Sequence, residues 1–380
     1  MRGHVRKRGN KWAVVVYLGY DEQGKKRYKW HGGFKTKREA ERFLASIAED
    51  VHDKTYVVPS KMPFRELFEA FLEFKRSKVK ESTIRQYRWY VEQYAMADIG
   101  HIPICDLKPT HFVRLYNRLR DEHGLTPNTL LIVHIACKQA MKAAVKWGYL
   151  ARNVMDAVDA PTPKRPKLQV WDEKQLRTFL SVAMEHQYGI AFLLLATTGM
   201  RVGEVLALRW RDVDLENGVI HVTQSVTRVQ NKLLVSSPKN AASNRAIAIT
   251  ADVVDALRRH KRAQNEVRLL MGQAWQDNDL VVCRVDGSYA LRETLDAAFK
   301  RIIKRLGLPR IRLHDLRHAH ATILLKLGVH PKVVQERLGH SNISTTLNTY
   351  SHVLPGLQEA AASAFSDLLR LDNVVSDNED

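Results

Sequence analysis

The sequence predicts a multidomain, mainly α-helical protein with a small N-terminal β-sheet and a second small antiparallel sheet inside a mostly helical C-terminal domain. Three observations lead to this fold class. β-rich runs occupy the first 35 or so residues, helical spacing of apolar residues dominates residues 61–160, and helical segments flank three β-like runs within residues 213–249. The length of 380 residues allows two or three domains.

Residues 1–58 are expected to form a three-stranded sheet with one helix. The runs WAVVVYLGY and KKRYKWH are rich in β-formers, and a polar turn that ends in Gly24 joins them. Thr36 precedes a helical stretch, and Glu39 follows it at the spacing of a capping box. A helix is therefore expected to pack on the sheet.

The second β-rich run carries a possible phosphate-binding face. Lys25, Arg27 and Lys29 recur at the period of two that places strand side chains on one face, and Tyr28 and Trp30 alternate with them. We expect the cations to contact phosphate while the other face packs. An ordinary solvated strand, whose cations deter aggregation, is the alternative.

Residues 61–160 are expected to form a helical domain, in which Ser82 and Thr83 offer N-caps for one helix. Three prolines and three cations in residues 159–167 predict an extended basic linker, with Lys164 and Arg165 as candidates for contact with a polyanion.

A third domain is expected over residues 168–371. Asp172 and Gln175 have capping-box spacing at its first helix. Residues 372–380 form an acidic tail.

The charge balance indicates a polyanionic partner. Lys and Arg total 60 against 41 Asp and Glu, which gives a net charge of +19. A uniformly basic solvated surface is the alternative. The three cysteines, Cys105, Cys137 and Cys283, lack the spacing of a disulfide framework or a zinc knuckle, and no apolar run is long enough for a membrane span. A cytoplasmic protein without membrane contact is expected.

Several residues have the properties needed to cleave a phosphodiester, which requires a nucleophile, charge stabilisation and a proton donor. Arg201 and Arg317 are permanently charged forks that suit phosphate oxygens. His314 lies three residues before Arg317, so the two share a helix face. His314 and His318 superficially resemble a zinc motif, but the Arg between them would repel a cation, so no metal is expected.

The ordered series TGMRVGE, PKN, HDLRH, LGH and Tyr350 resembles the tyrosine recombinase family, the phage integrase type of site-specific recombinase, over essentially all of residues 170–370. The resemblance implies a DNA breaking-rejoining fold for that region. For residues 61–160 it implies a SAM-like core-binding domain, and for residues 1–58 an arm-type DNA-binding domain.

The resemblance also implies roles for single residues. Tyr350 would attack DNA to give a 3′-phosphotyrosyl link, Lys239 would protonate the 5′ oxygen with Lys232 as its substitute, and His340 would donate to a phosphate oxygen. Glu204 would orient Arg201, and Asp315 would act similarly around His314. Neither ATP, a metal nor another cofactor is implied.

Family membership further implies duplex attachment sites, a homotetramer that works through a Holliday junction, and accessory proteins that bend DNA or set direction. Two alternatives stay open: a relaxing topoisomerase of the tyrosine type, and a DNA-binding regulator derived from a recombinase. A relaxing topoisomerase would give no recombinant product from two matching DNA sites, whereas a recombinase would. A DNA-binding regulator would form no covalent adduct with DNA.

Overall fold

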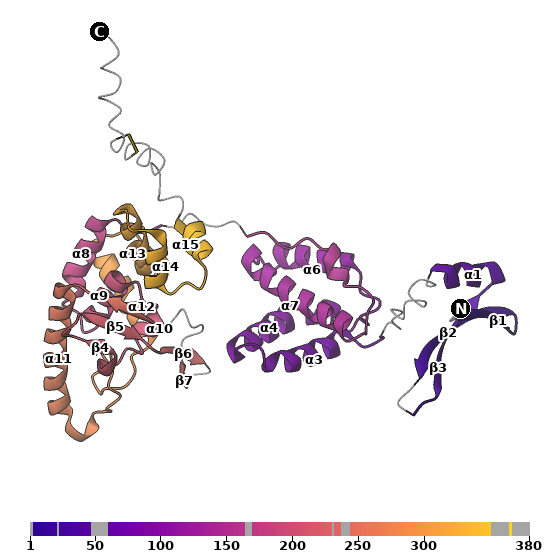
Figure 1. The fold of residues 1–380 in the computed structure, drawn as a ribbon, viewed down its shortest axis with the longest axis horizontal. Helices are drawn as coiled ribbons and strands as arrows, with labels where there is room; N and C mark the ends of the chain where they lie inside the picture. Colours follow the sequence, from indigo (N-terminus) through magenta and orange to yellow (C-terminus); the bar gives the residue numbers. More distant parts are fainter. Residues whose placement is uncertain are drawn as a thin grey trace, which may run out of the picture. The chain divides into compact units, whose positions relative to one another are not determined.

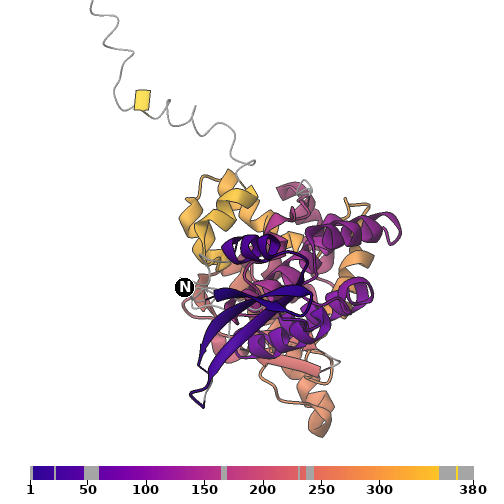
Figure 2. The ribbon, with the colours of Figure 1, turned by 90° about the vertical axis from the view of Figure 1, so that its right-hand side faces the viewer.

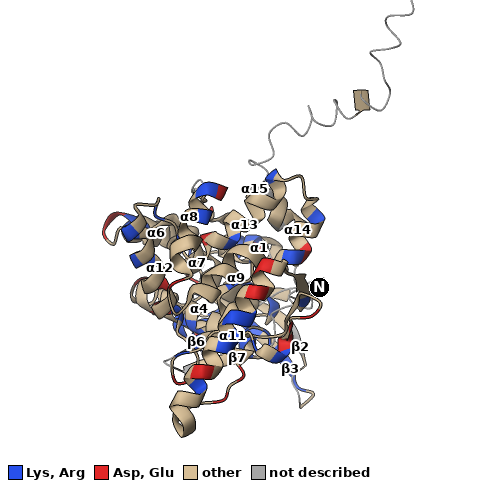
Figure 3. Ribbon diagram, turned by 90° about the vertical axis from the view of Figure 1, so that its left-hand side faces the viewer, with Lys and Arg blue, Asp and Glu red and all other residues tan. Residues whose placement is uncertain are grey.

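The structure is a computed structural model that describes residues 3–20, 23–46, 60–163, 169–229, 232–236, 244–350 and 365–366. The chain divides into two compact units, residues 1–166 and 167–380, and each is described by itself (Figure 1). Lys and Arg are distributed over many elements of the ribbon rather than gathered on one (Figure 3).

The N-terminal part of the first unit is an antiparallel sheet in the order β1-β2-β3. The strands are Gly3–Arg8, Lys11–Tyr20 and Lys26–Phe34, and α1, Lys37–Ser46, lies against them (Figure 2). The Thr36 hydroxyl accepts a hydrogen bond from the Glu39 backbone N–H at 3.1 Å, which caps α1 as predicted.

The two faces of β3 differ from the prediction. Lys29 is paired with Val16, which belongs to the small core under α1, so Lys29 lies on the face that the helix covers. Tyr28 and Trp30 point to the opposite face and are 49% and 43% exposed. The expectation that the aromatic face packs is therefore wrong, because α1 covers the valine face instead. Lys25, Arg27 and Lys29 are all exposed.

The second part of the first unit is helical. Its elements are α3 (Phe64–Arg76), α4 (Glu81–Tyr94), α5 (Met96–Ile99), α6 (Pro109–Asp121), α7 (Pro127–Lys146) and a 3-10 turn at Val154–Ala157. One apolar core joins them, with Phe64, Phe68 and Phe71 of α3 fully buried.

One helix start in this part differs from the prediction. Helix α4 begins after Lys80, whose extended backbone ends the preceding loop, so Ser82 and Thr83 lie inside the helix and the expected N-caps are wrong. Lys164 and Arg165 of the predicted linker lie outside the described residues.

The second unit is a mostly helical domain. Its helices are α8 (Glu173–Ala183), α9 (Gly189–Thr198), α10 (Val202–Val205), α11 (Ala251–Met271), α12 (Arg292–Leu306), α13 (Asp315–Lys326), α14 (Pro331–Leu338) and α15 (Ile343–Tyr350). Two 3-10 turns, Trp210–Asp212 and Gly272–Ala274, also occur in this unit.

Packing and capping in this unit follow the sequence pattern. Asp172 and Gln175 form the predicted capping box of α8. Trp171, Phe179 and Phe299 pack in the core in tilted and edge-to-face arrangements, with ring centroids 5.1–5.7 Å apart. Among the described residues of the chain, no helix has the length and apolar character needed to cross a membrane.

The strands of this unit form two sheets instead of the single sheet that was expected. Strands β4 (Val213–Asp214), β5 (Val219–Val222) and β8 (Arg245–Ala248) make one sheet, and β6 (Ser225–Val229) pairs with β7 (Lys232–Ser236) in the other. Each of the first two β-like runs folds back on itself. Strands β7 and β8, which precede and follow Lys239 in the sequence, belong to different sheets among the described residues, so the turn between paired strands that was expected around Lys239 is not supported. Residues 237–243 themselves lie outside the described part.

Gly199 sets the turn from α9 to α10. Its φ is +66°, and a Cβ atom there would lie 2.7 Å from Leu338 Cδ2 and 2.8 Å from His320 Cδ2. Both the left-handed backbone and the close approach of α13 and α14 therefore require glycine.

Gly199→Ala should destabilise the second unit by about 2–4 kcal/mol, because it adds overpacking to backbone strain. Gly307→Ala is the matched control, since Gly307 has φ of +63° with open space around it. Its cost should be limited to about 1 kcal/mol of backbone strain. Urea unfolding followed by tryptophan fluorescence measures both, and equal losses would show that the crowding does not matter.

Candidate active site

Two arginines converge on the C-terminal end of α14. Arg201, between α9 and α10, donates from Nη2 to the Gly339 carbonyl at 3.1 Å. Arg317, in the first turn of α13, donates from Nη2 to the Leu338 carbonyl at 2.8 Å and from Nη1 to the Gly199 carbonyl at 2.6 Å. The structure thus brings together the two arginines that the sequence predicted for one phosphate.

These contacts have a common physical basis. The last carbonyls of an α-helix lack intrahelical partners and form the negative end of the helix dipole, so a guanidinium fork both satisfies them and gains electrostatic energy. Arg317 is 2% exposed, whereas the Arg201 side chain is 39% exposed. Arg317 is therefore fixed within the domain, and Arg201 reaches the surface where a phosphate can approach.

Glu204 holds Arg201 in place. Its Oε2 accepts from the Arg201 backbone N–H at 2.9 Å, and its Oε1 accepts from Arg201 Nη1 at 2.7 Å. Burial raises the pKa of Glu204, but hydrogen bonds and charge from Arg245 and Arg201 outweigh it, so the pKa is lowered overall. An ionised Glu204 contacts Arg201 in the way its expected orienting role requires.

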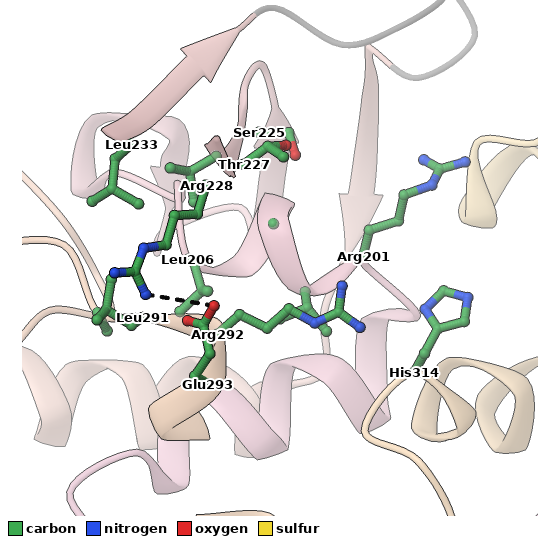
Figure 4. A pocket seen from close by; sticks show the side chains of 14 residues that line it. Arg201, Leu206, Ser225, Thr227, Arg228, Leu233, Leu291, Arg292, Glu293 and His314 are labelled. Carbon is green, nitrogen blue, oxygen red and sulfur yellow. Dashed lines mark ion pairs between the residues drawn. The ribbon is translucent and has the colours of Figure 1, made fainter. Parts of the chain in front are cut away.

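Two histidines flank the arginines. His314 precedes α13 and lines, with Arg201, one end of a pocket of about 460 Å³; Arg228 and Glu293 form an ion pair toward the other end (Figure 4). His340 directly follows Gly339.

Both histidines are neutral at pH 7. Burial, then the nearby His318 and Arg317, lowers the pKa of His314 to about 4. Burial, then Arg317 and Arg201, lowers the pKa of His340 to about 4. Each ring therefore has one nitrogen that donates and one that accepts.

Helix α15 brings the backbone of Tyr350 to the same end of the unit. His340 Nδ1 lies 2.9 Å from the hydroxyl of Thr346, which is buried in α15, and Tyr350 is the last residue of that helix. The side chains of Tyr350 and Lys232, and all of Lys239, lie outside the described part of the structure.

Asp315 holds the turn that precedes His314. Its carboxylate accepts from the Arg312 backbone N–H at 2.7 Å and from Arg312 Nη2 at 2.8 Å. These bonds fix the turn that leads into His314. Lys25, Arg27 and Lys29 belong to the first unit and to no part of this cluster.

Three residues of the site region were missed from the sequence: Arg245, Arg337 and His320. Arg337 donates to the Thr197 and Ala248 carbonyls at 3.0 and 2.9 Å and to His320 Nε2 at 3.1 Å. Arg245 shares a strand face with the buried Ile247, and this period-two pattern is the signal that would have pointed to it.

Among the described residues, no group of three or more His, Cys, Asp or Glu is placed to hold a metal ion. His314 and His318 contact edge-on, with ring centroids 5.1 Å apart.

Comparison with known proteins identifies the family. Residues 169–356 match the phage integrase family, residues 4–51 match an arm DNA-binding domain, and residues 63–120 match the N-terminal SAM-like domain of phage integrases. The chain belongs to the phage integrase family of tyrosine recombinases and is a site-specific DNA recombinase.

Two relatives match over nearly their whole length. A tyrosine recombinase XerC-like protein of Caldanaerobacter subterraneus is 28% identical, with 94% of this chain and 96% of the relative covered. The ICEBs1 integrase of Bacillus subtilis is 26% identical, with 94% and 97% covered.

Solved structures share the fold. The Tn1549 transposon integrase in complex with transposon right-end DNA has a TM-score of 0.68 at 23% identity, with 81% of this chain and all of that chain covered. A lambda integrase dimer bound to a core site has a TM-score of 0.56 at 15% identity, with 91% and 94% covered.

The buried histidines predict a pH dependence of stability. Burial is the main cause that lowers the pKa of His320 to about 3, and His314 and His340 fall to about 4, against about 6.5 in the unfolded chain. The unfolded state therefore binds more protons in this window, and stability is lost as pH falls from about 6.5 toward 4.

The urea midpoint of unfolding should decrease as the pH is lowered from 7.5 to 5. His320→Gln removes one titrating group, so its midpoint should depend less steeply on pH. An unchanged slope in that variant would contradict the assignment for His320.

Proposed function

We propose that the recombinase cleaves duplex DNA with Tyr350 as the nucleophile, at a phosphate held by Arg201, Arg317, His314 and His340. The observation that carries this proposal is the convergence of both arginines and His340 on the end of α14, with α15 leading from there to Tyr350. Two guanidinium groups beside neutral imidazoles suit the charge that develops on phosphate oxygens in the transition state.

The chemistry follows from these groups. The Tyr350 oxygen bonds to phosphorus as the bond to the 5′ oxygen breaks, which leaves a 3′-phosphotyrosyl link. Lys239 gives its proton to the 5′ oxygen, and the phenol proton passes to a neutral imidazole or to water. A phenol has an ordinary pKa near 10, so the cationic surroundings favour its ionised form. Attack by another 5′-hydroxyl reverses the steps, so no external energy source is needed.

The two parts of the first unit are proposed to bind DNA outside the reacting phosphate. We assign residues 1–58 to arm-type sites, residues 61–160 to the core site and residues 168–371 to catalysis, with residues 372–380 as a tail. The net charge of +19 supports contacts to phosphate by several modules. Lys25, Arg27 and Lys29 on β3, with Lys164 and Arg165, are the candidate contacts.

Strand exchange requires more than one copy. A lambda integrase tetramer bound to a Holliday junction has the same fold as this chain, with a TM-score of 0.55. That complex supports a homotetramer here, acting on two attachment sites in the bacterial cytoplasm, where proteins that bend DNA or set direction would assist.

Tyr350→Phe should abolish covalent capture of DNA while leaving the Kd for DNA within about twofold, because only the attacking oxygen is removed. The substrate is an attachment-site duplex, taken from repeated sequence that flanks the element encoding the chain and nicked beside the cleavage position. Denaturing gels detect the adduct. An adduct formed by the Phe variant would show that another residue is the nucleophile.

Lys239→Ala should slow cleavage by about 10²–10⁴-fold, the usual contribution of a general acid. Replacing the 5′ oxygen with sulfur should restore the rate, since a thiolate leaves without a proton at neutral pH. Lys232→Ala is the matched control and should cleave both substrates at the wild-type rate. If instead only Lys232→Ala is slow and sulfur at the 5′ position restores its rate, Lys232 is the general acid.

A further inference from the structure

We propose that Arg245, the first residue of β8, is a positioning residue for strand cleavage that holds Glu204 and the C-terminal end of α14 at the same time. This inference rests on the proposed function, because it concerns the geometry of Arg201 and His340 at that site. Arg245 lies outside the groups assigned to the phosphate.

Arg245 makes one contact to α10 and another to α14. Nη2 donates to Glu204 Oε2 at 2.9 Å, and Nε donates to the Arg337 carbonyl at 2.7 Å. The side chains of Arg245 and Glu204 are 6% and 3% exposed, so water screens this ion pair little. One guanidinium thus joins α10, which carries Glu204, to α14, which leads to His340.

Arg245 also completes a series. Arg245, Arg317 and Arg201 bind the carbonyls of Arg337, Leu338 and Gly339, which are three successive residues. The three arginines come from β8, α13 and the residue before α10. Together they fix the end of α14 from three sides, and His340 is the next residue along the chain.

Glu204 needs both of its arginine partners to stay ionised and oriented. Its Oε2 accepts from Arg245 Nη2 and from the Arg201 backbone, and its Oε1 accepts from Arg201 Nη1. Removal of one partner from a buried ion pair leaves charge that the remaining contacts compensate poorly. Loss of Arg245 would therefore release Glu204, and with it the orientation of Arg201.

The fork of arginine is required for this geometry. Lysine keeps the charge beside Glu204 but has a single ammonium group, so it does not reproduce the Nε bond to Arg337 and the Nη2 bond to Glu204 together. Arg245→Lys thus separates the presence of charge from the position of the two helices. A small displacement of positioned groups is enough to cost up to 10²-fold in rate.

The test uses the full-length chain with Arg245→Lys and Arg245→Met. Arg268→Met is the matched control, because Arg268 is ion-paired with Asp277 at 2.7 Å on the exposed end of α11, away from the site residues. Three quantities are measured for each variant: the Tm, the Kd for the intact attachment-site duplex, and the single-turnover rate of covalent adduct formation on the nicked duplex.

Arg245→Lys should keep its Tm within a few degrees and its Kd within twofold, while adduct formation slows at least tenfold. Arg268→Met should match the wild type in Kd and rate. Adding Glu204→Gln to Arg245→Met should slow the reaction no further than Arg245→Met alone, because both changes release the same contact.

Three results would overturn the proposal: an Arg245→Lys rate within twofold of the wild type, a loss of rate matched by an equal loss of affinity, or fully multiplicative effects in the double variant. If Arg245→Met does not fold, Arg245→Lys decides between the outcomes. A wild-type chain that forms no adduct contradicts the proposed function instead, so the two failures are distinguishable.

Discussion

Arginine forks on the carbonyl ends of two helices are the constraint on which the rest of the site depends. Helix α9 ends at residue 198 and α14 at residue 338, and both helix ends lie inside the second unit with carbonyls that need partners. Arg317 binds both ends, since it contacts the Gly199 and Leu338 carbonyls. These contacts join α9 to α14 and also fix the position of the Arg317 guanidinium. The same interactions therefore stabilise the fold and preorganise the site.

The arginines of the site can be buried because their contacts with Glu204 and with helix-end carbonyls are charge-assisted. The pKa values of the neighbouring glutamate and histidines are also lowered. Glu204 stays ionised between two arginines, whereas His314, His320 and His340 stay neutral. The region thus carries the positive charge of its arginines without the repulsion that imidazolium ions would add. In the proposed site a phosphodiester would reach Arg201, the more exposed of the two arginines.

The sequence indicated candidate members of the site but not the residues that hold them in place. Arg201, His314 and Arg317 were named through short motifs that resemble those of the family, whereas the caps of α1 and α8 follow from capping-box spacing. The contacts of Arg245 span 41 and 92 positions of the chain, and no local pattern encodes such pairings. The two-sheet arrangement was missed because pairing of β8 with β5 depends on the fold. The Ser82 and Thr83 caps failed because the backbone at Lys80 starts α4 earlier.

The hydrogen bond between His340 and Thr346 links the protonation pattern of the site to the helix that ends in the tyrosine. When the threonine hydroxyl donates to Nδ1, the imidazole carries its hydrogen on Nε2 and presents a donor to a phosphate oxygen. In that tautomer the contact with Thr346 leaves Nε2 as the donor nitrogen of the ring, so the placement of the imidazole hydrogen depends on how α15 packs against His340.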